Sequence, residues 1–354
     1  MPPIIDIHTH VFSLDPARSG CTLSPKSEKR ALTYYLRWRN GIGLSEELAA
    51  AEEKFQAKWL QVIEETEQVD RIVILAHDAV YEKGGKLSEE KTHFYVPNDY
   101  VLALSKKHPK LLAGASVHPF RRDALEEIDR VMEQGAVLVK WLPNTQGFDP
   151  MDRDHIPFFR KLADRRVALL CHTGPEFALK SLDQSLGHPD RLRLALETGV
   201  TVIAAHGGGW GLLPQLGFKK FTMMLLDYPN FYTDTSALTL PPRSRYLIKL
   251  LDRPELHAKL VHGSDYPLPV SPWPFFGRIP LKEARRLSKI RSPIDRDLLI
   301  KKALGFPDAV FENAAVLIGE ERLRRRNPGT DEKKSVGPAQ AGPTEIGDRR
   351  EANT

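Results

Sequence analysis

Cysteine is scarce in this chain of 354 residues, where only Cys21 and Cys171 are present. Two distant cysteines give no disulfide framework, so we expect a reducing, cytoplasmic environment. The N-terminal residues also lack a basic stretch followed by a long apolar run, and we therefore expect no secretory signal. No apolar run approaches the ~20 residues of a membrane span. We accordingly predict no membrane partner.

An excess of charge of one sign is missing as well. The chain has 51 Lys and Arg residues against 46 Asp and Glu residues, which gives a net charge of +5. This balance is too small to argue for nucleic acid as a partner. The expected partner is therefore a small-molecule substrate.

A dinucleotide-binding glycine fingerprint is also absent, although the chain alternates between strand-like and helix-like segments. Helical periodicity covers residues 100–108, 124–133, 156–165, 190–198 and 245–252. Short apolar runs cover residues 4–7, 71–76, 111–117, 136–142, 168–171, 200–205, 231–235 and 260–262. Eight such runs between helices predict an α/β fold, a (β/α)₈ TIM barrel over residues 1–319.

Two regions interrupt the alternation. Residues 11–68 form an insertion too long for an ordinary loop, with an amphipathic helix over roughly residues 45–65. Because it follows the first strand, it should emerge at the C-terminal mouth of the barrel, as a lid, as the arm of a homodimer or as an insertion without a role. We predict that residues 37–59 approach the mouth and that Arg37 or Arg39 holds a substrate carboxylate. Residues 327–354 contain no aromatic residue, and this composition predicts a disordered tail.

The first ten residues place two histidines at the end of an apolar run. Alternate side chains of a strand share a face, so Asp6, His8 and His10 are predicted to point in one direction. Two imidazoles on one face can bind one divalent ion together, and neutral imidazole suits zinc.

Other chemically active side chains follow later strands. His172 follows the fifth run, His206 follows the sixth, Asp265 follows the eighth, and Lys140 lies in the fourth. Active sites of (β/α)₈ barrels lie where the strands end, so side chains at several strand ends should also meet in space. Trp141, Trp210 and Trp273 lie near strand ends and are predicted to border the substrate, although ordinary packing explains them equally well.

These elements, in this order, resemble the amidohydrolase superfamily. The segments Lys140-Trp-Leu-Pro, Cys171-His-Thr-Gly, His206-Gly-Gly and Gly263-Ser-Asp-Tyr-Pro resemble its amidohydrolase-related branch, which includes aminocarboxymuconate semialdehyde decarboxylase and related hydrolases. The resemblance covers most of residues 3–319.

The resemblance implies a divalent metal site, with zinc the expected ion. His8, His10, His172 and Asp265 would be its ligands. Asp265 would also take a proton from water and pass it to a leaving group. His206 would be either an acid–base residue or a ligand of a second metal ion.

Lys140 decides between mechanisms but has three interpretations. It can form a carbamate that bridges two metal ions, remain a cation that binds a substrate carboxylate, or be a lysine at the rim whose amine reaches solvent. The leading prediction is a metal-dependent hydrolase of a small carboxylated or cyclic amide, lactone or ester. The alternatives are a metal-dependent decarboxylase and a barrel that only binds metal. Lys140 favours hydrolysis, because related decarboxylases do not generally carry a lysine there.

Overall fold

The computed structural model describes residues 2–43, 45–209 and 216–324. Within them, eight parallel strands form one sheet whose order follows the chain. They are β1 (Ile5–His10), β3 (Arg71–Leu75), β5 (Leu111–Ala115), β6 (Ala136–Trp141), β7 (Ala168–Cys171), β8 (Val202–Ala204), β9 (Phe231–Asp234) and β10 (Leu260–Val261). Seven of the predicted apolar runs contain one of these strands, and the first run, residues 4–7, overlaps β1, which continues to His10. Trp210 and the predicted tail lie outside the described residues.

The last strand returns to the first and closes the sheet. The Ile7 N–H donates to the His262 carbonyl over 3.1 Å, and the His10 N–H donates to the Tyr266 carbonyl over 2.7 Å. These bonds join the two outer strands of the eight-stranded sheet, which is thereby nearly closed into a barrel. The predicted (β/α)₈ barrel is therefore confirmed.

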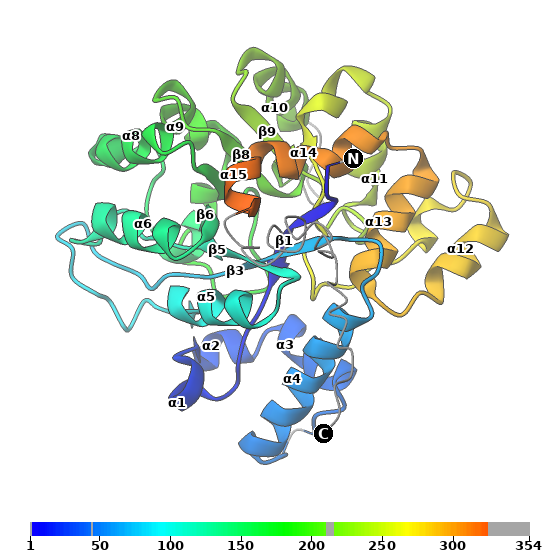
Figure 1. Ribbon diagram of the computed structural model, residues 1–354, viewed down its shortest axis with the longest axis horizontal. Helices are drawn as coiled ribbons and strands as arrows, with labels where there is room; N and C mark the ends of the chain where they lie inside the picture. Colours follow the sequence, from blue (N-terminus) through cyan, green and yellow to red (C-terminus); the bar gives the residue numbers. More distant parts are fainter. Residues whose placement is uncertain (1, 44, 210–215, 325–354) are drawn as a thin grey trace, which may run out of the picture.

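Helices surround the strands (Figure 1). The helices between and after the barrel strands are α5 (Asn98–Lys107), α6 (Ala124–Glu133), α7 (Pro143–Gln146), α8 (Ile156–Asp164), α9 (Arg193–Glu197), α10 (Leu216–Asp227), α11 (Ser244–Leu251), α12 (Leu281–Ser288), α13 (Pro293–Leu304), α14 (Asp308–Ile318) and α15 (Glu320–Arg324). The five predicted helical segments correspond to α5, α6, α8, α9 and α11. Among the described residues, no helix is both long and apolar enough to cross a membrane.

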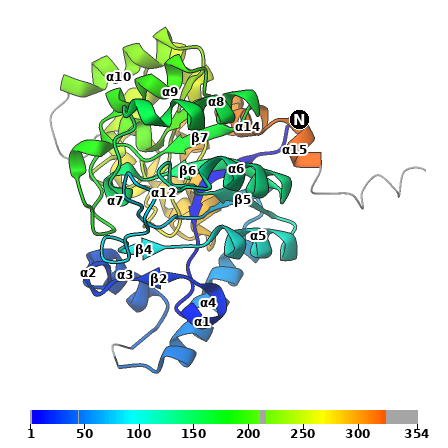
Figure 2. The same cartoon turned by 90° about the vertical axis from the view of Figure 1, so that its left-hand side faces the viewer.

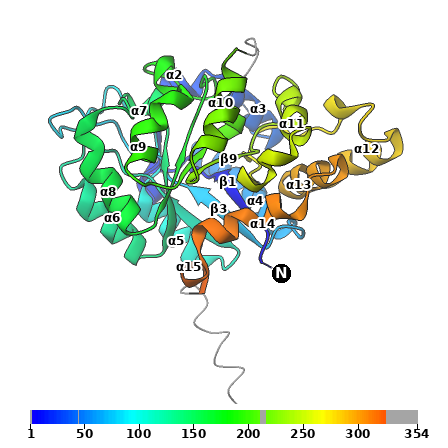
Figure 3. The ribbon, with the colours of Figure 1, turned by 90° about the horizontal axis from the view of Figure 1, so that it is seen from above.

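Apolar side chains fill two separate layers. Ile5, Ile7 and Leu138 belong to the interior of the barrel, whereas Ile72 and Val139 belong to the layer between the strands and the helices. Helix α14 contributes to the interior layer and contacts both β1 and β10. In Figures 2 and 3, α15 and the N-terminus lie at the opposite end of the barrel from α2 and α3. The strands' carboxyl ends therefore face the end where α2 and α3 lie.

A β-bulge in β1 corrects one prediction. Regular alternation predicted that Asp6 shares a face with His8 and His10, but the pairing of β1 with β3 shifts register between Asp6 and Thr9. The extra residue changes which side chains point inward. Ile7 remains in the interior layer, and the Asp6 carboxylate instead accepts hydrogen bonds from the backbone N–H groups of His8 and Ser264.

The insertion after β1 contains α1 (Pro16–Ser19), β2 (Thr22–Leu23), α2 (Pro25–Glu28), α3 (Ala31–Arg39) and α4 (Leu48–Glu64). Strand β2 pairs antiparallel with β4 (Phe94–Tyr95), which lies in the long connection after β3. Helix α4 buries Trp59, Val62 and Ile63 on one face, as its amphipathic pattern requires. The insertion is thereby attached to the barrel at two places.

Candidate metal centre and active site

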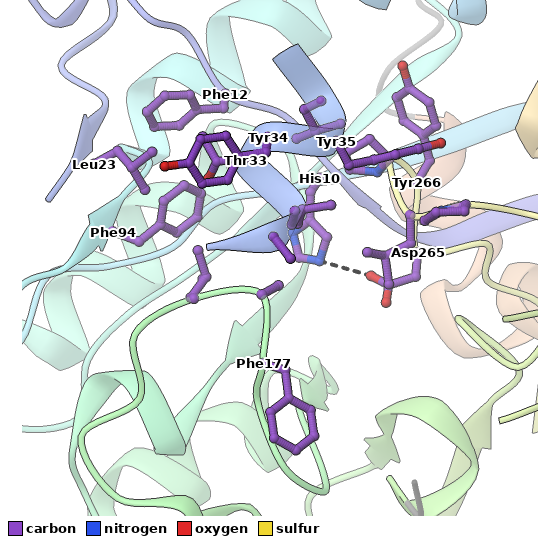
Figure 4. A pocket seen from close by; sticks show the side chains of 18 of the residues that line it. His10, Phe12, Leu23, Thr33, Tyr34, Tyr35, Phe94, Phe177, Asp265 and Tyr266 are labelled. Atoms are coloured by element: carbon purple, nitrogen blue, oxygen red, sulfur yellow. Dashed lines mark ion pairs between the residues drawn. The ribbon is translucent and has the colours of Figure 1, made fainter. Parts of the chain in front are cut away.

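A cavity of about 950 Å³ opens where the barrel strands end. Its lining includes His10, Lys140, His172, His206 and Asp265 from the strand ends. Side chains of the insertion border it on another side (Figure 4). The structure thus brings these five predicted residues of the strand ends to a single cavity, and His8 lies buried directly behind them.

His8, His10 and Asp265 converge. The Nε2 atoms of His8 and His10 lie 3.5 and 3.2 Å from the Asp265 Oδ1 atom. One potential ligand atom from each of the three residues lies within 4.8 Å of the others. Burial would raise the pKa of Asp265, but His206 and His8 hold it well below its usual range. Asp265 is therefore an ionised carboxylate beside two imidazoles.

Asp234 fixes the orientation of His8. The His8 Nδ1 atom donates to Asp234 Oδ2 over 2.7 Å, which leaves Nε2 pointing towards Asp265 and Lys140. The other carboxylate oxygen accepts the backbone N–H groups of His206 and Ser236. Burial would raise the pKa of Asp234, yet His8 lowers it below its ordinary value. A carboxylate that holds the second nitrogen of a histidine is a common support for a metal ligand.

His172 and His206 form a second pair beside the first. His172 Nδ1 and His206 Nε2 share a hydrogen bond of 3.1 Å, and His206 Nδ1 lies 2.8 Å from the Ser236 hydroxyl. Burial lowers the pKa of His206 to about 3, so its imidazole is neutral at pH 7. The buried His172 Nε2 atom has no hydrogen-bond partner among the described residues. His172 is therefore near the first three residues but does not converge with them as closely.

Two site residues have left-handed backbone conformations. The φ angle is 60° at His206 and 63° at Asp265. Such angles are unfavourable for residues with a Cβ atom and are often found at functional sites. The glycines after His206 serve packing of the chain: a Cβ atom on Gly209 would lie 1.9 Å from the Thr173 carbonyl oxygen. The backbone that approaches Gly209 is thus that of the neighbouring loop.

Lys140 is 1% exposed, so its amine does not reach solvent at the rim. Its Nζ atom lies 3.1 Å from His8 Nε2. Burial lowers the pKa of the amine, which favours the neutral, nucleophilic form. The amine therefore lies within the cluster of potential metal ligands, and the interpretation as a solvent-reaching rim lysine is corrected.

The described tryptophans that were predicted to border the substrate do not line the cavity. Trp141 follows Lys140 by one residue and so faces the helices, where its indole N–H donates to the Val117 carbonyl over 2.8 Å. The prediction that Trp141 borders a substrate is thus wrong. Trp273 begins the 3₁₀ helix η6 (Trp273–Phe275) and is not among the side chains that line the cavity. Arg37 does line the cavity and donates to the Gly43 carbonyl.

Three polar residues of the site were missed in the sequence. Asp234 ends the seventh predicted strand, and its position at a strand end was a usable signal. Glu176 and Arg243 lie in loops after β7 and β9, where no periodicity indicates which side chains turn inward. Glu176 accepts the N–H groups of Ala178 and Leu179, and burial raises its pKa.

The donor set suits a divalent metal ion. Imidazole nitrogens and carboxylate oxygens are ligands of zinc, and a catalytic zinc site commonly uses three protein ligands and leaves a further position open. Three features fit such an ion: the close approach of His8, His10 and Asp265, the support of His8 by Asp234, and the buried His172 Nε2 atom, which has no hydrogen-bond partner among the described residues.

The sequence also matches a known family. The model of the family described as amidohydrolase matches residues 5–286, and the chain therefore belongs to this family. Family membership and the cluster at the barrel mouth indicate an enzyme. Among curated proteins, no significant match was found.

Solved structures share the fold. A putative 2-pyrone-4,6-dicarboxylic acid hydrolase from Pseudomonas putida is 15% identical with a TM-score of 0.54, over 91% of this chain and 99% of that one. An uncharacterized TIM-barrel protein from Bordetella bronchiseptica is 15% identical with a TM-score of 0.53, over 84% and 99%. A 4-oxalomesaconate hydratase from Rhodopseudomonas palustris is 15% identical with a TM-score of 0.50, over 94% and 99%. At this identity the likeness shows the fold alone.

Proposed function

We propose that this protein is a metal-dependent hydrolase that cleaves an amide, lactone or ester bond in a carboxylated or cyclic substrate. The observation that carries the proposal is the convergence of His8, His10 and Asp265 at the end of the cavity where the barrel strands end. We call this end, with Lys140, His172 and His206, the floor of the cavity. His8, His10, His172 and Asp265 would hold a divalent ion, zinc by preference. Such an ion, when bound, supplies Lewis acidity and lowers the pKa of a water molecule to about 7.

Asp265 is the residue that moves protons in this proposal. Its carboxylate accepts a proton from the attacking water and returns it to the leaving amine or alcohol. Because its pKa is lowered, the Asp265 carboxylate is ionised at neutral pH and has an oxygen that can accept a proton. His206 lies 3.7 Å from the other Asp265 oxygen and, as a neutral imidazole, can orient either the carboxylate or the substrate carbonyl.

Lys140 supports hydrolysis over decarboxylation. In its neutral form, the buried amine can react with CO₂ to form a carbamate and release a proton, and the carbamate oxygens would then be further potential metal ligands. If the amine is protonated instead, it can bind a carboxylate of the substrate. Both roles use the position of Nζ beside His8.

The reaction can be tested by product analysis. Zinc-reconstituted protein is incubated with a panel of carboxylated amides, lactones and esters, and both hydrolysis products and CO₂ are measured. We expect hydrolysis without CO₂, and we expect chelation to abolish it and added zinc to restore it. Release of CO₂ from a carboxylated aromatic compound would indicate a decarboxylase instead. Turnover that is unaffected by complete metal removal would contradict the proposal.

A further inference from the structure

The cavity is much larger than its polar floor requires. Its volume of about 950 Å³ is near the upper end of the ~300–1,000 Å³ that small-molecule sites occupy. The potential metal ligands occupy only one end of it. A substrate with a few carbon atoms would leave most of this volume to water. The side chains of the remaining wall therefore indicate the size and polarity of the substrate.

Apolar side chains dominate the part of the wall away from the strand ends. We name this part the upper chamber, and its principal side chains are Phe12, Leu23, Tyr34, Phe94 and Phe177. They come from the insertion, from β4 and from the loop after β7. In Figure 4, Phe177 lies on the opposite side of the cavity from Tyr34 and Phe94, and the ion pair of His10 and Asp265 lies to one side of these rings.

The chamber has both a stable side and an open side. The rings of Phe12 and Phe94 stack with centroids 5.3 Å apart, which makes them a fixed wall. Phe177 and Tyr34 are 68% and 52% exposed, although both line the cavity. Large rings exposed at the edge of a cavity gain most when an apolar ligand covers them. The open side therefore suits an apolar group of the substrate.

Among the described residues that line the cavity, Arg243 is a half-buried cation without a partner, whereas Lys29 is exposed to solvent. The Arg243 guanidinium makes no hydrogen bond or ion pair with any residue in the part of the chain that the structure describes, and it is half-buried in the cavity wall. Its charge reaches His172, Glu176 and His206, and it lowers the pKa of both histidines. The side chain thus lies close to the polar floor.

Arg37 and Arg39 differ from Arg243 because other groups already engage them. Arg37 donates to the Gly43 carbonyl, and Arg39 donates to the Pro267 carbonyl over 3.4 Å and lies over the Tyr266 ring. A guanidinium offers a planar fork of donors that matches a carboxylate. Arg243 is therefore the better candidate for binding an anion.

We propose that the substrate carries a bulky apolar body, aryl or branched alkyl, beside a single anionic group. The apolar body lies in the upper chamber between Tyr34 and Phe177, and the anionic group faces Arg243. The bond to be cleaved then lies over the floor. The placement of that bond rests on the proposed hydrolase function, whereas the binding of the two groups needs no turnover.

The test is the binding of three probes to zinc-reconstituted protein by calorimetry. Naphthalene-2-carboxylate has both groups, naphthalene-2-carboxamide lacks the charge, and acetate lacks the rings. We expect naphthalene-2-carboxylate to bind at least about tenfold more tightly than acetate, because the rings bury apolar area. We also expect it to bind about tenfold more tightly than the carboxamide, because of its charge-assisted hydrogen bonds.

Matched variants separate the two contacts. Arg243→Gln should remove most of the preference for carboxylate over carboxamide, whereas Arg285→Gln, at an exposed arginine of α12 outside the cavity, should not. Phe177→Ala should weaken the binding of naphthalene-2-carboxylate but not the binding of acetate. Phe276→Ala is its control, because Phe276 is 72% exposed but does not line the cavity. These side chains are at least partly exposed, and thermal melting checks that each variant is folded.

Two results would overturn the proposal. If naphthalene-2-carboxylate binds no more tightly than acetate, the upper chamber does not select an apolar body. If Arg243→Gln keeps the full preference for carboxylate, Arg243 does not bind the anion. Hydrolysis of small substrates without naphthalene-2-carboxylate binding would contradict this inference alone, whereas tight binding without any metal-dependent hydrolysis would contradict only the proposed function.

Discussion

The floor and the upper chamber of the same cavity are built in different ways. The floor takes its side chains from strand ends and from the residues directly after them, such as His8, His172 and Asp265. The chamber takes its side chains from the insertion and from long connections, such as Tyr34, Phe94 and Phe177. Closure of the barrel holds the side chains of the floor in fixed positions, which suits catalytic residues. The insertion and the long connections can vary without disturbing the barrel, so they can adapt the chamber to one substrate.

The largest expected effect lies on the floor, at Asp265. Asn in place of Asp keeps the shape and one oxygen ligand, and Asn tolerates the left-handed backbone found at this position. It removes the proton acceptor, so Asp265→Asn should lower kcat about 100-fold or more while part of the metal remains bound. Steady-state kinetics together with metal analysis measures both effects.

The control for this change is Asp252→Asn, at an exposed aspartate that pairs with Arg278 and does not line the cavity. It should leave kcat unchanged. If Asp265→Asn retained full turnover with full metal content, Asp265 would not move protons, and the division between floor and chamber would lose its chemical basis.

A substitution at Asp234 tests whether the metal ligands of the floor depend on the hydrogen bond between Asp234 and His8. Asp234→Asn keeps the size of the side chain but weakens its hold on the His8 Nδ1–H group. Loss of such support typically lowers metal affinity about 10- to 100-fold. Competition with a chelator of known affinity measures the change. Unchanged metal affinity would mean that His8 is oriented by the barrel alone.

Lys140→Ala distinguishes the two remaining interpretations of the lysine. If Lys140 forms a carbamate, the variant should lose metal. If it is a cation that binds a substrate carboxylate, metal should remain and KM should rise about tenfold, the effect of losing a hydrogen bond to a charged group. Lys282→Ala, at an exposed position of α12, is the control. Full metal content with unchanged kinetics would remove the main reason for preferring hydrolysis.

The smallest effect is expected at Cys171, the residue before His172. Cys171 belongs to the layer between strands and helices, and burial raises the pKa of its thiol to about 12. The thiol should therefore not react with a disulfide reagent in the native protein, and Cys171→Ser should change turnover about twofold or less. Rapid labelling of Cys171 under native conditions would show that the layer between the strands and the helices opens beside β7.

The strands were the most predictable part of the molecule, because buried parallel strands are short apolar runs bounded by polar residues. The gathering of His10, Lys140, His172, His206 and Asp265 followed from the same pattern, since the strands of a barrel all end at one face. The position of Asp6 was not predictable, because alternation assumes a regular strand and β1 contains a bulge.

The loops and the chamber were less predictable. Arg243 and Glu176 follow strands at a distance of several residues, where no repeating pattern decides which side chains turn inward. The insertion was recognised by its length, but the pairing of β2 with β4 depends on two segments far apart in the sequence. The aromatic wall depends on how these segments dock, and neither composition nor periodicity contains that information.

The most direct test of the floor is the metal content of the purified protein, measured by elemental analysis after reconstitution with zinc. About one or more divalent ions per chain are expected in the natural protein and in His188→Ala, a variant at an exposed histidine. His8→Ala and His172→Ala should each lose the ion. A natural protein without metal after reconstitution, or a His8→Ala variant with full metal content, would contradict the assignment of the strand-end cluster as a metal centre.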